Sequence, residues 1–230
     1  MVLPLYLALT AAEFAFCSRL PEKMAWMACH FSPYGTGLSN LPPAFPGSSM
    51  VILNDRTPIN GHDPKQILCQ LKELNPNLLL LDFQRQEVAE TTQLTSILVE
   101  GMDCPVGVSH FYAHGLDCPV FLPPVPPDVP LEEYLAPWPG REIWLEAALD
   151  GLTYTVTEKG SVSAPLLHIP ENGLIEPDLC CHYQIAELKN RVEFHLYRTA
   201  DDLSSLLQKA KSHGVTTAVG LYQELGKIKL

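Results

Sequence analysis

The chain has 230 residues, of which 47% are hydrophobic and 18% are charged. This length and composition fit one large globular domain with enough apolar material for a core, and they exclude a mainly disordered chain. The net charge is −11 and no basic run occurs, which excludes a protein that binds nucleic acid through its phosphates. No apolar stretch reaches the ~18–20 residues that a membrane-spanning helix needs. We therefore expect neither a nucleic acid nor a membrane as a partner.

The first 18 residues predict a strand followed by a helix. Four leucines alternate with other residues between positions 3 and 9, which is the pattern of one strand face. Thr10 stands three residues before Glu13, and this capping-box spacing predicts a short helix over residues 11–18. We interpret the segment as the first elements of the fold and not as a targeting peptide, because no lysine or arginine precedes its apolar run.

Strands and helices then alternate over the first half of the chain. Asp63 and Pro64 form a typical helix start, and another helix is expected over residues 88–102. The four leucines before Asp82 suit a strand that is buried on both faces, as in a parallel sheet. The alternation predicts βαβ units with right-handed crossovers. Strands are expected over residues 4–9, 24–30, 50–54, 78–83 and 105–109.

A different pattern begins after residue 150. Apolar segments at 153–157 and 162–167, and again at 181–187 and 192–197, flank turn residues and predict two antiparallel hairpins. We therefore divide the chain into a β/α barrel core, residues 1–150, and an α+β region, residues 151–230, which can supply the closing strand. The predicted fold class is α/β: a trimmed or irregular TIM-like barrel, because eight βα units need at least about 200 residues.

Polar residues concentrate where the predicted strands end. In a β/α barrel these ends share one rim, and ligands bind there. The fingerprints GxGxxG and GxxxxGK[ST] are missing, so we favour a barrel over a doubly wound nucleotide-binding sheet and expect no cofactor. The polar residues at the strand ends are Thr10, His30, Asp55, Arg56, Asp82, Gln84, His110 and Glu146.

Residues 77–84, at the end of the fourth strand, read NLLLLDFQ. This segment resembles the chitinase-like glycoside hydrolases of the family 18 type, which carry DGxDxDxE there and use the final glutamate as the catalytic acid. Asp82 matches the last aspartate of that motif, whereas Leu80 replaces the middle one. Gln84 stands at the position of the acid, and its amide cannot donate a catalytic proton. The resemblance therefore implies a sugar-binding TIM barrel that lacks the chitinase proton donor.

Three residues are candidates for catalysis. Asp82 ends a buried strand, so its carboxylate must face the rim or pair with a buried partner. If residues 141–149 form a strand, Glu146 shares a face with Trp144 and can supply a second carboxylate. A separation of ~5–5.5 Å from Asp82 would then predict a retaining enzyme, and ~6.5–9.5 Å an inverting one. His110 is a candidate general base, because an unperturbed histidine pKa lies near ~6.5.

Five residues are candidates for ligand binding. The rings of Tyr34 and Tyr112 can stack on sugar faces, although core packing is the alternative for aromatic residues. Asp55 and Arg56 can bind polar groups or form a local turn or ion pair. Gln84 can bind through its amide.

The seven cysteines predict free, reduced thiols. Their number is odd and Cys180 adjoins Cys181, so a complete set of disulfides within the chain is impossible. Most lie in apolar runs, which favours a cytoplasmic location. No CxxC pair occurs, and we expect no metal site.

Three functions are compatible with these patterns. The first is a glycoside-hydrolase-like barrel that binds or hydrolyses a carbohydrate at its rim. The second is a non-catalytic protein that binds a glycan or another small ligand, with Gln84 in place of the acid. The third is a metal-dependent phosphoester hydrolase, whose residues would be His30, Asp55, Asp82 and His110. The expected partner is a small molecule or carbohydrate, and the patterns do not predict an oligomeric state.

Overall fold

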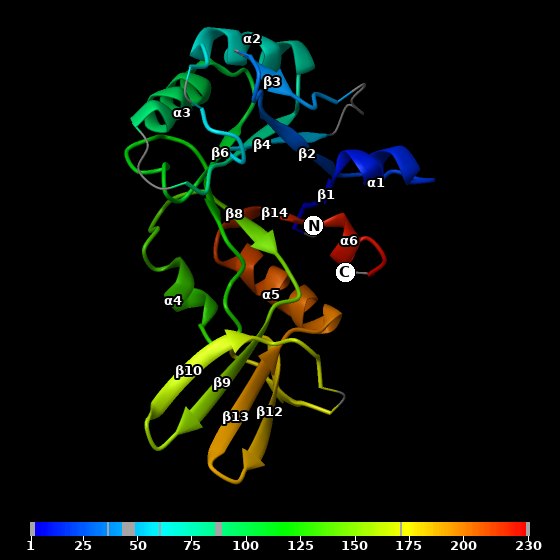
Figure 1. Cartoon of the computed structure of the whole chain (residues 1–230), viewed down its shortest axis with the longest axis vertical. Coiled ribbons are helices and arrows are strands. Elements are labelled where there is room, and N and C mark those ends of the chain that lie inside the picture. The colour runs from blue at the N-terminus through cyan, green and yellow to red at the C-terminus, as the bar shows by residue number, and fades with distance from the viewer. Residues whose placement is uncertain are drawn as a thin grey trace.

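The computed structural model describes residues 3–35, 37–42, 49–59, 61–85, 89–170 and 172–228, and it contains a barrel and a separate antiparallel sheet (Figure 1). Eight parallel strands form the barrel in the order β1-β14-β8-β7-β6-β5-β4-β2, and the pairing of β1 with β2 closes the ring. The prediction of a TIM-like α/β barrel is thus confirmed. The barrel strands are β1 Leu5–Leu9, β2 Met24–Phe31, β4 Met50–Asn54, β5 Leu78–Asp82, β6 Val106–Ser109, β7 Val120–Leu122, β8 Ile143–Ala147 and β14 Val215–Leu221. A short strand, β3 (Leu38–Ser39), pairs antiparallel with β2.

The helices pack outside the barrel, and local sequence fixes where several of them start. Thr10 and Glu13 form the expected capping box at α1, and Asp63 caps α2 through the backbone N–H of Lys65. The connection between β6 and β7 contains turns but no helix, so the barrel is irregular as expected. No helix in the described ranges is long and apolar enough to cross a membrane. The helices are α1 Ala11–Phe16, α2 Pro64–Leu74, α3 Ala89–Gly101, α4 Leu131–Leu135, α5 Ala200–Ser212 and α6 Tyr222–Leu225.

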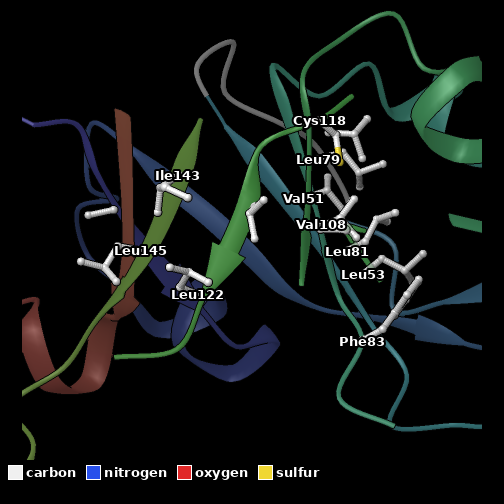
Figure 2. Packing of buried hydrophobic residues seen from close by; sticks show 14 of the residues in the cluster. Val51, Leu53, Leu79, Leu81, Phe83, Val108, Cys118, Leu122, Ile143 and Leu145 are labelled. Atoms are coloured by element: carbon white, nitrogen blue, oxygen red, sulfur yellow. The ribbon is translucent and has the colours of Figure 1, made fainter. Parts of the chain in front are cut away.

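Side chains alternate between two apolar layers along regular barrel strands such as β5. On β5, Leu79 and Leu81 belong to the outer layer between the barrel and its surroundings, together with the neighbouring Val51, Leu53 and Val108 (Figure 2). Leu78 and Leu80 instead pack inside the barrel. Because the strand period is two, the same alternation turns Asp82 toward the interior at the point where β5 ends.

Trp144 fills the interior of the barrel and is 1% exposed. It packs with Tyr6, Met50 and Phe121, and its indole lies where a side chain at Gly107 would project. Trp144 therefore has a core-packing role.

We expect Gly107→Ala to destabilise the fold by about 1–3 kcal/mol, because the added methyl group would overlap the Trp144 ring. Chemical denaturation measures the loss. Gly35→Ala is the matched control, since the nearest atom to a Cβ there, Ser32 Oγ, lies at an ordinary 3.6 Å. Trimming the ring in a Gly107→Ala/Trp144→Leu double variant should relieve part of the clash. Additive effects of the two substitutions would contradict this account.

The second sheet is inserted between β8 and α5 and lies at one end of the molecule (Figure 1). Both expected hairpins are present, and the pairing of β9 with β13 joins them into one sheet of order β10-β9-β13-β12-β11. After this sheet the chain returns through α5 to β14, which takes its place between β1 and β8. The strands are β9 Gly151–Thr157, β10 Gly160–Pro165, β11 Leu174–Glu176, β12 Cys181–Leu188 and β13 Arg191–Tyr197. All seven cysteines are free thiols in the structure.

Candidate functional site

A cavity of about 530 Å³ opens at the carboxyl ends of the barrel strands. Five of the eight predicted site residues line it: Asp55, Arg56, Asp82, Gln84 and Glu146. Its base is apolar because inward-facing side chains of the barrel strands form it. The other lining residues are Ala8, Thr10, Met27, Ala28, His30, Asn40, Ile52, Asn54, Leu80, Phe121, Val219, Gly220 and Leu221.

Asp82 is the last residue of β5 and contributes a partly desolvated carboxyl group to the cavity. Burial raises its pKa above the ordinary aspartate value. The hydrogen bond that Gln84 Nε2 donates to Asp82 Oδ1 opposes this shift, and the negative charge of Asp55 adds to it. The net effect is a carboxyl group that holds its proton to a higher pH than an exposed aspartate does.

Gln84 lies two residues beyond Asp82 and lines the same cavity. Its amide lies beside Asp82 and donates a hydrogen bond to that carboxyl group. The side chain carries no acidic proton, so this part of the site offers polar contacts to a ligand without an acid.

Glu146 reaches the cavity from β8, on the opposite face of the strand from Leu145. Burial, followed by the negative charges of Asp82, Asp150 and Glu224, raises its pKa to about 7. Near neutral pH about half of the Glu146 side chains therefore carry a proton. The site thus contains a second carboxyl group that can donate a proton where an ordinary glutamate would be ionised.

Asp55 follows β4 and is 4% exposed. Its Oδ1 accepts the backbone N–H of Gln84 at 3.1 Å, and its Oδ2 accepts that of Arg85 at 2.8 Å. Both oxygens are therefore engaged by backbone, which favours the structural alternative over the ligand-binding role predicted for this carboxylate. Arg56, by contrast, is exposed and borders the cavity.

The structure does not bring the other three predicted site residues to the cavity lining. Tyr34 is 98% exposed on the loop after β2. His110 directly follows β6, but its ring packs at a tilt of 36° against Phe111 with centroids 3.9 Å apart. Burial and the nearby His114 lower its pKa. Tyr112 is 6% exposed because the chain turns after β6 and directs it into the outer core, where its hydroxyl donates to the carbonyl of Arg85.

Two amides at the cavity were not among the predicted site residues. Asn54 ends β4 and donates to the carbonyls of Met27 and Cys29, so it fixes the neighbouring β2. It begins the polar triplet of residues 54–56, and this run of polar residues at the end of an apolar strand was a usable signal. Asn40 Nδ2 lies 3.0 Å from His30 Nε2. Asn40 sits in a long loop, and no pattern in that loop distinguishes it.

Metal ligands do not converge on this rim in the part of the chain that the structure describes. Among these residues no group of three or more His, Cys, Asp or Glu side chains is placed to hold an ion. The structure therefore adds no support to the metal-dependent phosphoester hydrolase considered from the sequence.

Solved structures with a similar fold include a chitinase and a spore cortex-lytic enzyme. One is the class V chitinase of Nicotiana tobaccum, a glutamate-to-glutamine mutant in complex with NAG4, with a TM-score of 0.54, 10% identity, and coverage of 96% of this chain and 93% of that one. The other is the spore cortex-lytic enzyme SleL of Bacillus cereus, with a TM-score of 0.52, 11% identity, and coverage of 95% and 70%. No family model and no curated protein matches the sequence. The chain therefore shares its TIM-like barrel fold with these two structures.

Proposed function

We propose that this protein binds a carbohydrate in the cavity at the carboxyl rim of its barrel. The observation that carries the proposal is the convergence of Asp82, Gln84 and Glu146 on one cavity. Carboxyl and amide groups are well suited to sugar hydroxyls, because together they both accept and donate hydrogen bonds. The apolar base, with Leu80 and Phe121, can receive the less polar face of a sugar ring.

The similarity of the barrel to a chitinase in complex with NAG4 supports chito-oligosaccharides as the first ligands to test. We expect the wild-type protein to bind them saturably in isothermal titration calorimetry. Asp82→Ala should weaken binding about tenfold or more, because a charge-assisted hydrogen bond contributes about 1.5–3 kcal/mol. Asp103→Ala is the matched control: this aspartate is 88% exposed and pairs with Lys72 at the opposite end of the barrel strands. Binding that is absent, or that Asp82→Ala leaves unchanged, would argue against the proposed site.

Hydrolysis is a second candidate function, and the raised pKa of Glu146 favours it. In this mechanism protonated Glu146 donates its proton to the glycosidic oxygen as that bond breaks. Ionised Asp82 takes a proton from the water that attacks the sugar carbon, so the products are two sugars with free hydroxyl groups. Gln84 then contributes binding only.

Turnover of chromogenic chito-oligosaccharides separates the two candidates. A binding protein should hydrolyse these sugars only at the background rate. General acid catalysis contributes ~10²–10⁴-fold to hydrolysis, and the Gln84 amide cannot supply it. A hydrolase that uses Glu146 should instead cleave these substrates and lose activity as the pH rises past about 7. The Glu146→Gln variant should be inactive at every pH. Turnover that survives Glu146→Gln would exclude Glu146 as the acid.

A further inference from the structure

The turn that carries Gln84 is held from both neighbouring strands. This β5 turn, residues 83–85, directly follows β5. From β4, Asp55 accepts the N–H groups of Gln84 and Arg85. From β6, the hydroxyl of Ser109 donates to the carbonyl of Phe83 at 2.7 Å. The backbone of the turn is therefore fixed at each of its three residues.

Asp55 makes the larger part of this attachment. Carboxylate-to-backbone hydrogen bonds are charge-assisted and are stronger than the neutral bond from Ser109. The carboxylate is almost fully buried, so little solvent competes with it. Since the backbone of Gln84 is fixed by Asp55, the direction of its side chain toward Asp82 depends on the same contact.

We propose that Asp55 is a positioning residue, which holds the β5 turn so that the Gln84 amide stays hydrogen-bonded to Asp82 and the pair is ready to receive a sugar hydroxyl. The functional meaning of this role rests on the carbohydrate site proposed above. Its structural content, that Asp55 acts on Asp82 through Gln84, does not depend on the ligand.

Two ways of acting on Asp82 predict opposite results. The charge of Asp55 raises the pKa of Asp82, whereas the hydrogen bond from Gln84 lowers it and has the larger influence. If Asp55 acts only by its charge, Asp55→Asn must lower the pKa of Asp82. If Asp55 positions Gln84, Asp55→Asn loses the hydrogen bond as well, and the pKa of Asp82 must rise. Glu146 and Arg56, the other charged groups at the cavity, remain present in both cases.

The test is a carbon-13 NMR titration of the Asp82 carboxyl group in the full chain. We expect Asp55→Asn and Gln84→Leu each to raise the pKa of Asp82, and Asp55→Asn to give no further rise in the Gln84→Leu background. Asp55→Glu keeps the charge but displaces the turn, so it should also raise the pKa of Asp82. This variant replaces Asp55→Asn in the test if Asp55→Asn does not fold. Asp63→Asn removes an equivalent carboxylate-to-backbone bond at α2 and should leave Asp82 unchanged.

A fall in the Asp82 pKa in Asp55→Asn, or no change in Asp55→Glu, would overturn the positioning role. Calorimetry with chito-oligosaccharides adds the functional readout, in which Asp55→Asn should weaken binding about tenfold, as expected for losing a charge-assisted hydrogen bond. If the wild-type protein binds no sugar, the carbohydrate proposal fails, while the titration still decides whether Asp55 positions Gln84.

Discussion

Replacing Glu146 by glutamine is expected to make the protein more stable at alkaline pH. Burial and three negative neighbours raise the pKa of Glu146 from the ordinary 4.5 to about 7. Between these values the folded chain keeps a proton that the unfolded chain releases. The contribution of Glu146 to stability is therefore complete below pH 4.5 and is lost as the pH rises through 7. Above that range Glu146 is ionised in the folded chain, where burial and its negative neighbours disfavour the charge and lower the stability of the fold.

Glu146→Gln keeps the size of the side chain and removes the charge. We expect the variant to match the wild type near pH 4 and to exceed it by about 2–3 kcal/mol at pH 8.5, allowing for partial solvent access. Urea denaturation at both pH values measures the difference. Glu133→Gln, on the exposed side of α4, is the control and should give no pH-dependent gain. The same offset at pH 4 and pH 8.5 would show that Glu146 titrates as an ordinary glutamate.

The positions of the barrel strands could be predicted because the hydrophobic pattern decides them locally. The run of leucines before Asp82 is long enough for one buried strand and ends in a polar residue, so both the strand and the rim position of Asp82 follow from it. The shared face of Glu146 and Trp144 was predicted only on the condition that this segment is a strand, and β8 meets that condition because side chains alternate along it. These inferences need only neighbours in the sequence.

The roles of Asp55 and Tyr112 could not be predicted, because their partners are distant in sequence. An aspartate at a strand end looks the same whether it binds a ligand or, like Asp55, accepts N–H groups from a turn 29 residues further along the chain. Tyr112 is directed into the core by a turn after β6 that its own residue type does not specify. The union of the two hairpins by β9 and β13 is equally non-local.

Arg198 connects the inserted sheet to the rest of the chain and is 1% exposed. Its guanidinium donates to four backbone carbonyls: those of Leu179 and Cys180 in the turn before β12, and those of Val125 and Pro126 in the segment after β7. Burial lowers its pKa, but an arginine remains charged in this range. The carbonyl dipoles thus stabilise the positive charge of Arg198. Because the guanidinium is buried, water does not take its place as the donor to these carbonyls if the side chain is removed.

We expect Arg198→Met to cost about 3–5 kcal/mol, because several buried carbonyls lose their donor at once. Arg198→Lys keeps the charge but cannot reach four acceptors, so it should cost about 2–3 kcal/mol and serves where the methionine variant does not fold. Arg191→Met, which breaks only the half-exposed pair with Glu193, should cost less than about 1 kcal/mol. Hydrogen exchange in Arg198→Lys locates the loss: amides of β12 and β13 should lose protection before those of β4 and β5. Equal loss in all four strands would mean that Arg198 supports the whole fold as one cooperative unit and not the attachment of the inserted sheet.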